Sequence, residues 1–288
     1  MAKFLKGRIQ SNAKGSKEGD SKNDSSFLKR FSFLKWLDPF TYVDLFVMPQ
    51  VRRVSKSFYV EVAVNVFFAI VFAWIVYTVL GVVFGTSSPL VIVYSGSMEN
   101  VFFRGDVMLL SKINSSAYAG AFVDLNRAIE GVPVFEYLEP KYYSLSESPN
   151  PNNLRLESFY FKDLNKYVEP NKEGFVVVYN SYPNNLPIIH RAILKINAND
   201  GVFFLTKGDN DLTNPSFDAD CGRVVDLGYG RIYSEKPCIT LYAIPEKEIV
   251  GMTFGIIPKI GCVKLWIFDD IPHLIMRGNL PNDFKGIC

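Results

Sequence analysis

The sequence predicts a mainly β protein: a single N-terminal transmembrane helix, then an extracytoplasmic antiparallel β-domain with an inserted excursion. Three observations predict this fold class: one long uncharged apolar stretch, a series of short β-branched runs after it, and a polar segment that interrupts those runs. With 288 residues, of which 48% are hydrophobic, the chain can bury a proper core. We therefore expect a tail over 1–57, an anchor over 58–85 and an exported domain over 86–288.

The tail over 1–57 is basic. It carries 12 Lys and Arg against 5 Asp and Glu, a charge of +7, whereas the whole chain carries only +2. The remaining residues are therefore slightly acidic, which does not suit a nucleic-acid-binding protein. Residues 11–26 are polar and rich in Gly and Ser, so we expect a mobile tract. Residues 27–37 combine Phe and Leu at helical spacing with basic side chains, which predicts either a helix on the inner membrane face or an ordinary cytoplasmic helix.

The stretch Val62–Phe84 predicts the membrane anchor. Its 23 residues carry no charge, and only Asn65 and Thr78 are polar. About 20 apolar residues suffice to span a bilayer as a helix. A buried core helix and a cleaved signal peptide are both disfavoured, because the run is long, lies deep in the chain and has no A-x-A site after it. Three basic residues within 52–56 precede the run and predict a cytoplasmic N-terminus.

Beyond the anchor, short apolar runs separated by Gly, Pro, Asn and Asp predict strands without intervening helices. The Pro-, Asn- and Ser-containing tract within 114–170 predicts an excursion inserted between core strands. The closing segment 249–268 is apolar but interrupted by Pro and Lys, so we expect a sheet strand or a membrane-contacting surface there. The expected strands cover 106–112, 174–180, 187–196, 201–209, 223–233 and 238–244.

All four cysteines follow the anchor. An oxidising exterior permits a Cys221–Cys238 or a Cys262–Cys288 bridge, and sequence alone leaves the connectivity open. Because no CxxC spacing occurs and the chain has only two histidines, neither a zinc site nor a cofactor is expected.

Ser97, in the sequence YSGSMEN at 94–100, is a candidate nucleophile shortly after the anchor. A serine hydroxyl needs a base within hydrogen-bond reach. The only histidines are His190 and His273, and strand alternation in 187–196 places His190 on the apolar face. This pattern fits a buried core histidine, or a base held between a hydroxyl and an acid.

An acidic stretch follows nineteen residues after His190, with Asp209, Asp211, Asp218 and Asp220. Such a stretch can be a surface turn or a calcium loop, although the EF-hand pattern of a closing Glu and a sixth-position Gly is not met.

Five segments in order resemble the conserved boxes of type I signal peptidases: SGSME at 95–99, GDVMLL at 105–110, GFVVVY at 174–179, IIHRAI at 188–193 and TKGDND at 206–211. Bacterial members carry lysine where this chain has His190, so the resemblance is to the archaeal and endoplasmic-reticulum branch. It implies Ser97 as nucleophile and His190 as general base. It also implies an oxyanion hole from the Ser97 N–H and the Ser95 hydroxyl, although Ser95 also fits a plain turn residue.

The resemblance implies one or two orienting acids. Asp209 matches the first family aspartate, and Asp218 is our choice for the second, with Asp220 in reserve. Met98 is the residue that the family suggests for substrate contact. Most relatives have proline where this chain has Asn100, which concerns the shape of the loop and not the nucleophile.

The predicted function is a membrane-bound serine endopeptidase that cleaves signal peptides from exported preproteins at the outer surface of the cell membrane or the endoplasmic-reticulum membrane. The expected partners are signal peptides of secretory preproteins, membrane lipid and secretion-channel or accessory subunits, with no nucleic acid and no cofactor. The alternative is a catalytically inactive, membrane-tethered β-domain that binds exported chains or an accessory subunit.

Overall fold

The computed structural model describes residues 38–145, 153–182, 184–221, 223–226, 231–234, 239–282, 284 and 288. The predicted tract 11–26 and the predicted helix over 27–37 lie outside these residues. The chain divides into two compact units, Met1–Ile75 and Val76–Cys288, and the division falls inside the long helix α4 (Phe58–Phe84). Each unit is therefore described by itself.

In the first unit, short helical segments precede α4. Their bounds are α2 Pro39–Tyr42, η2 Val43–Val47 and α3 Met48–Val54. Asp38 caps the first of them by accepting a hydrogen bond from the Phe40 N–H at 3.0 Å. The 27 residues of α4 include the predicted span, and within the described part of the chain α4 alone is long and apolar enough to cross a membrane.

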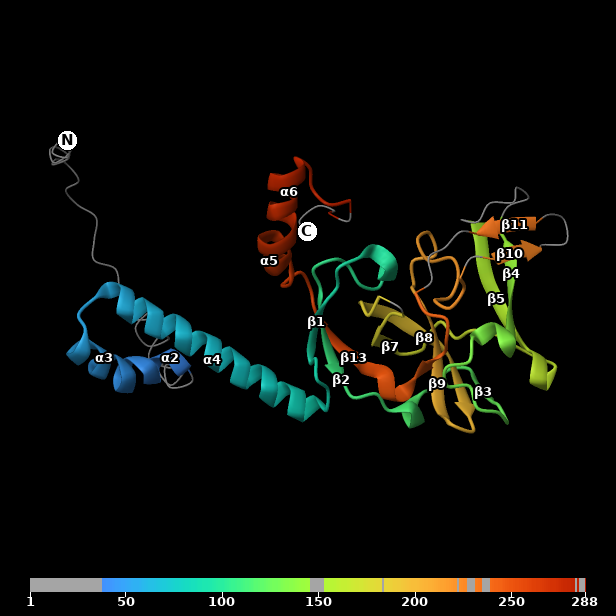
Figure 1. Cartoon of the computed structure of the whole chain (residues 1–288), viewed down its shortest axis with the longest axis horizontal. Helices are drawn as coiled ribbons and strands as arrows, with labels where there is room; N and C mark the ends of the chain where they lie inside the picture. The colour runs from blue at the N-terminus through green and yellow to red at the C-terminus, as the bar shows by residue number, and fades with distance from the viewer. Residues whose placement is uncertain are drawn as a thin grey trace, which may run out of the picture. The chain divides into compact units, whose positions relative to one another are not determined.

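The second unit is built on one mainly antiparallel sheet with the order β1-β2-β13-β7-β8-β9-β12 (Figure 1). Strand β3 joins this sheet by parallel pairing with β8. The fold class predicted from the sequence is thus confirmed. The strand bounds are β1 Leu90–Ile92, β2 Val107–Ser111, β3 Phe122–Asp124, β7 Val176–Asn180, β8 Pro187–Ala198, β9 Gly201–Lys207, β12 Ile244–Pro245 and β13 Ile249–Ile257.

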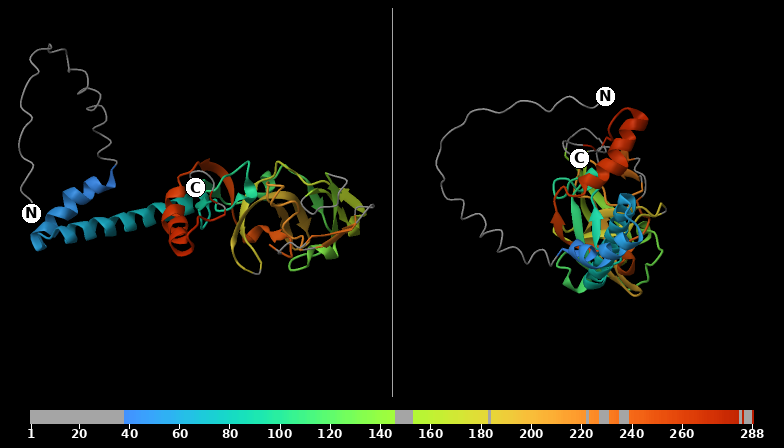
Figure 2. Two further views of the ribbon diagram at one scale, coloured as in Figure 1. Left: turned by 90° about the horizontal axis from the view of Figure 1, so that it is seen from above. Right: turned by 90° about the vertical axis from the view of Figure 1, so that its left-hand side faces the viewer.

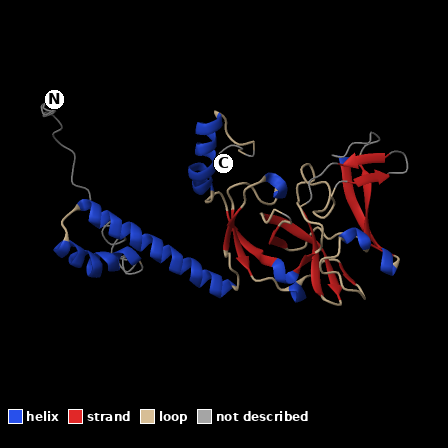
Figure 3. Ribbon diagram, viewed as in Figure 1, coloured by secondary structure: helices blue, strands red, loops and turns tan. Residues whose placement is uncertain are grey.

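Two smaller sheets complete the β structure of the described residues (Figure 3). One has the order β4-β5-β6, lies within the predicted excursion 114–170, and is called the inserted sheet below. The other is the β10–β11 hairpin, where the sequence had predicted one strand over 223–233. The bounds are β4 Leu138–Ser144, β5 Leu154–Phe161, β6 Lys166–Val168, β10 Arg223–Asp226 and β11 Arg231–Ser234, and the short 3-10 turns are η3 Gly96–Met98, η4 Ser115–Ala117, η5 Val134–Glu136, η7 Lys162–Leu164 and η8 Glu246–Glu248.

The strand predicted over 238–244 is wrong for most of its length. Of its described residues only Ile244 is in a strand. The Thr240 hydroxyl accepts from the Tyr242 N–H at 3.2 Å and donates to the Tyr242 carbonyl at 3.1 Å. These local bonds occupy backbone groups that a sheet ladder would otherwise use.

The closing segment is part strand and part helix. Strand β13 forms as predicted, but residues from 262 onward form α5 Cys262–Leu265, η9 Trp266–Asp270 and α6 Ile271–Arg277, together called the C-terminal segment. The Cys262–Cys288 disulfide, one of the two bridges permitted by the sequence, ties this segment to the last residue. Cys221 is also disulfide-bonded, and Cys238 lies outside the described residues. Figures 1 and 2 show the C-terminal segment at the β1 end of the main sheet.

Candidate active site

Ser97 lies in η3, a turn that the next residue anchors in the core. Met98 is buried and packs with apolar side chains of β2 and β7. Its carbonyl accepts hydrogen bonds from the N–H groups of Val101 at 3.0 Å and Phe102 at 2.9 Å. With Met98 fixed, Ser97 stays partly exposed, and its Oγ lies 3.3 Å from the Ser95 Oγ.

One face of the main sheet carries three polar side chains on adjacent strands: Tyr179, His190 and Thr206. They share that face because His190 pairs with Val177 across β7–β8, and Thr206 pairs with Ala192 across β8–β9. The Thr206 hydroxyl donates to the Tyr179 oxygen at 3.2 Å. The alternation of side chains along each strand thus places these three polar residues together on an otherwise apolar face, as the sequence predicted for His190.

Asp218 lies over these three residues. Its Oδ2 is 2.7 Å from Nδ1 of His190 and accepts a hydrogen bond from the Tyr179 hydroxyl at 2.8 Å. The side chains of His190 and Asp218 are only 3% and 0% exposed. Burial, and secondarily the Asp218 charge, raises the pKa of Tyr179 well above 10, so this phenol remains a hydrogen-bond donor. A donor at Nδ1 of His190 leaves Nε2 with a lone pair, which is what a general base requires.

Gly208 brings the imidazole and the serine turn together. A Cβ built at this glycine would lie 3.0 Å from His190 Nε2 and 2.7 Å from the Ser97 carbonyl oxygen. Any larger residue would therefore separate the two. Ser97, Ser95 and His190 all line one cavity of about 1080 Å³, together with Met98 and Asn214. Within the described part of the chain the Ser97 hydroxyl pairs with Ser95 and not with the imidazole.

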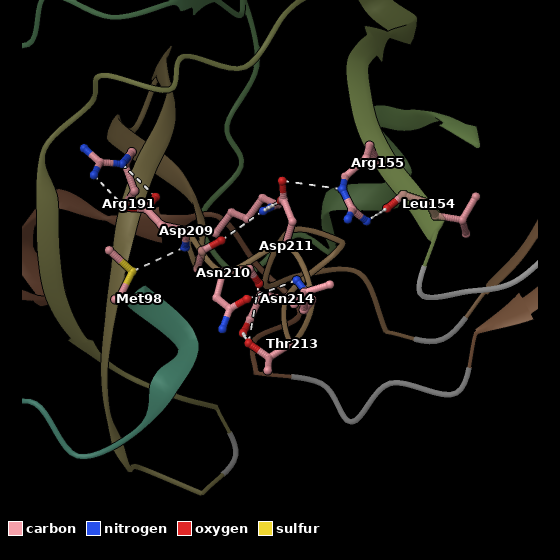
Figure 4. A network of polar contacts seen from close by, with 12 residues as sticks. Met98, Leu154, Arg155, Arg191, Asp209, Asn210, Asp211, Thr213 and Asn214 are labelled. Atoms are coloured by element: carbon pink, nitrogen blue, oxygen red, sulfur yellow. Dashed lines mark hydrogen bonds and ion pairs between the residues drawn. The ribbon is translucent and has the colours of Figure 1, made fainter. Parts of the chain in front are cut away.

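The loop after β9 holds the serine turn from the other side. Residues 208–220 are called the aspartate loop. Asn210 donates its N–H to the Ser97 carbonyl at 2.9 Å and its side-chain amide to the Gly96 carbonyl at 2.9 Å. Figure 4 shows the neighbouring Asp209 between Met98 and Arg191. The turn that carries Ser97 is thus fixed by both the core and this loop.

The three aspartates that the sequence offered as acids have three different partners. Asp218 contacts His190. Asp209 forms a two-pronged ion pair with Arg191, at 2.8 and 2.6 Å. Asp220 accepts a hydrogen bond from the Tyr142 hydroxyl of the inserted sheet. Only the first of these contacts can orient an imidazole.

The C-terminal segment lines the cavity with Leu265 and Phe268. Two connections hold it there. The buried Arg104 guanidinium contacts Asp269 at 2.6 Å and Asp270 at 2.9 Å. The Cys262–Cys288 disulfide packs on Gly105, whose φ of +86° and lack of a Cβ allow both sulfur atoms to approach.

Sequence reasoning missed several of these residues. Tyr179 ends the GFVVVY segment, and strand alternation could have placed it on the His190 face. Asn210 lies in the TKGDND segment, but nothing local shows that its side chain reaches the serine turn. The Arg104 ion pairs span more than 160 residues of sequence, so no local pattern indicates them.

Comparison with known proteins finds relatives among signal peptidases. Curated sequences from Saccharomyces cerevisiae strains YJM789, RM11-1a and JAY291, each named signal peptidase complex catalytic subunit SEC11, are 26% identical over 217 residues, or 75% of this chain and 87% of theirs. No family model matches. The chain is a relative of the type I signal peptidases. The resemblance predicted from the five motifs is confirmed, as is the expected class of enzyme, a signal peptidase of the serine hydrolase type.

Proposed function

We propose that this signal peptidase relative is a membrane-anchored serine endopeptidase that removes signal peptides from exported preproteins. The observation that carries the proposal is the buried His190–Asp218 contact at 2.7 Å, beside a cavity that Ser97 also lines. A histidine that only filled the core would need no serine turn beside its second ring nitrogen. Here Gly208, which has no Cβ, lets the turn that carries Ser97 lie close to Nε2 of His190. This arrangement therefore favours catalysis over the inactive β-domain.

In the proposed reaction the Ser97 side chain rotates from Ser95 toward His190 Nε2, which takes its proton as Oγ attacks the scissile carbonyl. The imidazolium that forms is stabilised by the Asp218 carboxylate. The same proton then passes to the leaving amine, and an ester of Ser97 remains. Water, deprotonated by His190, hydrolyses this ester and restores the serine.

The negative oxygen of the tetrahedral intermediate needs hydrogen-bond donors. The Ser97 N–H and the Ser95 hydroxyl lie at the cavity and are the proposed donors. Because a single such donor typically accounts for a rate factor of about 10²–10³, Ser95→Ala should lower kcat by about that factor.

The substrate is proposed to bind in the cavity as an added strand. The edge strand β1 and the start of β8 supply apolar lining, including Val91, Ile92 and Ile188. An extended peptide can pair with an exposed sheet edge, and apolar pockets would receive alternate side chains. Small residues such as Ala, Gly or Ser at the positions before the cleaved bond fit this proposal.

The membrane arrangement is also proposed: tail 1–57 in the cytoplasm, anchor 58–85, and domain 86–288 with its insertion 114–170 on the exported side, in the endoplasmic-reticulum or cell membrane. Basic residues before α4 support this orientation. At the C-terminal end of α4, the ring of Phe84 packs against the ring of Phe254 in β13, with the two ring centroids 4.9 Å apart. The name of the yeast relatives includes a complex, so accessory subunits are proposed as partners of this chain too.

Side-chain exposure supports contact between the C-terminal segment and lipid. Large apolar residues of this segment point to solvent, among them Phe268 at 74% and Ile275 at 78% exposed. Exposed apolar surface of this kind is stabilised when it is buried at a lipid boundary.

The test is cleavage of a preprotein by the full-length chain in proteoliposomes. Ser97→Ala and His190→Ala should each abolish detectable processing. The matched control is His273→Ala, which removes the only other histidine, one that contacts a backbone carbonyl, and should cleave at the wild-type rate. Equal processing by all four proteins would favour the inactive β-domain.

A further inference from the structure

The inserted sheet contacts the aspartate loop at three places, and the family resemblance assigns it no role. The sheet joins β4, β5 and β6 and lies at the opposite side of the β-domain from the C-terminal segment (Figures 1 and 3). The aspartate loop carries both Asp218 and the Asn210 contacts to the serine turn. A sheet that grips this loop can therefore affect the catalytic geometry.

The first contact is a buried hydrogen bond just after Asp218. The Tyr142 hydroxyl of β4 donates to Oδ2 of Asp220, and both residues are less than a tenth exposed. A hydrogen bond from a neutral donor to a buried carboxylate is stronger than one between neutral groups. The backbone two residues beyond Asp218 is thus held to the inserted sheet.

The second contact lies just before Asp218. The Phe217 ring is buried and packs edge-to-face on Phe159 of β5, with ring centroids 5.1 Å apart. Phe135 of η5 packs on the same ring at 6.2 Å. Asp218 is therefore flanked on both sides by residues that are buried against the inserted part of the chain.

The third contact is at the start of the loop. Arg155 of β5 lies 3.5 Å from Asp211, next to Asn210 (Figure 4). Asp211 is 47% exposed, so solvent weakens this ion pair, and it contributes less than the other two contacts.

We propose that the inserted sheet positions the catalytic acid: Tyr142, through Asp220, and Phe159, through Phe217, hold the aspartate loop so that Asp218 meets His190. Tyr142 is then a positioning residue and does not touch substrate. The proposal rests on the proposed function, because positioning of Asp218 matters only if His190 is the base. A displacement of about 1 Å in a catalytic group can cost about a hundredfold in rate, so a modest loosening of the loop should be measurable.

The experiment compares two adjacent tyrosines in the full-length chain in proteoliposomes. Tyr142→Phe removes only the buried hydroxyl, whereas the control Tyr143→Phe removes one from a side chain that is 45% exposed on the other face of β4. We expect Tyr142→Phe to lower kcat by about tenfold, less than the roughly hundredfold cost of a 1 Å displacement, and to leave KM within about twofold. Tyr143→Phe should match the wild type.

Two readouts separate positioning from a general structural role. The loss in Tyr142→Phe should fall on kcat and leave KM within about twofold, because the groups that would bind the substrate are not moved. In an Asp218→Asn background, Tyr142→Phe should cost no further activity, since both changes remove the same effect. An equal loss in that background would overturn the proposal.

The controls cover misfolding and failure of the wider proposal. If Tyr142→Phe does not accumulate as folded protein, Asp220→Asn tests the same contact from the loop side and should show the same selective loss in kcat. If Ser97→Ala is inactive and the variant that folds keeps the wild-type kcat, the positioning role is refuted and the proposed function stands. Cleavage by Ser97→Ala itself would instead refute the proposed function.

Discussion

The inserted sheet and the C-terminal segment lie on opposite sides of the candidate site and use their apolar residues in opposite ways. The inserted sheet buries Phe159 against the aspartate loop. The C-terminal segment is fastened by a disulfide and by the Arg104 ion pairs, and directs Phe268 outward. The sheet therefore packs within the domain itself, whereas the C-terminal segment leaves large apolar side chains exposed to solvent.

The largest expected effect contrasts one substitution in the two regions. Phe159→Ala should lower the free energy of unfolding by about 3–5 kcal/mol, because it opens a cavity in the core. Phe268→Ala should change it by less than about 0.5 kcal/mol, because the side chain is already exposed. Denaturant titration of the full-length chain in detergent measures both, and similar losses would mean that the two regions do not differ as described.

For ion pairs the larger loss of stability is expected in the C-terminal segment and the smaller loss in the inserted part. Arg104→Met leaves the buried Asp270 without its cation and should cost about 3 kcal/mol of unfolding free energy. The matched change Arg127→Met in the inserted part breaks an exposed pair with Asp163, and should cost less than about 1 kcal/mol. If thermal unfolding places the two variants at the same midpoint, the C-terminal segment is not held by Arg104.

The disulfide should contribute somewhat less than the buried ion pair. The combined variant Cys262→Ser with Cys288→Ser opens a loop that spans 26 residues, and should cost about 2 kcal/mol of unfolding free energy. Because Leu265 and Phe268 line the cavity, KM for a preprotein should also rise. Steady-state kinetics with and without reductant check this. If reductant leaves the KM of the wild type unchanged, the disulfide does not contribute to substrate binding.

The smallest effect is expected at Arg155. Arg155→Ala removes a half-exposed ion pair with Asp211 and should change the free energy of unfolding by no more than about 0.5 kcal/mol. The rate of preprotein cleavage should fall by less than about twofold, since a change of that size in free energy corresponds to only a small factor in rate. If the loss in cleavage rate were as large as that of Tyr142→Phe, the contact with Asp211 would matter as much to activity as the contact with Asp220.

Features encoded over a few neighbouring residues were predictable from the sequence. The apolar run Val62–Phe84 lies within helix α4, because length and lack of charge act locally. The buried face of β8 carries His190 because side chains alternate along any strand. Most of the predicted strands formed, and the strand over 238–244 failed where the Thr240 side chain bonds to nearby backbone.

The choice among the aspartates could not be made from the sequence. Asp209, Asp218 and Asp220 share one loop, and only the path of that loop decides which carboxylate meets an imidazole. The helical form of the C-terminal segment was not predicted either, and the ion pairs that fasten it involve Arg104, which lies 166 positions from Asp270.

The sequence by itself determined the long apolar helix, the mainly β fold, the relationship to signal peptidases, and the types of residue at the candidate site. Only the tertiary structure decided that His190 contacts Asp218, that Tyr142 reaches Asp220 across 78 positions, and that Arg104 contacts Asp270 across 166. Periodicity and composition act between neighbours, whereas these contacts require distant segments to pack together, and packing depends on the whole chain at once.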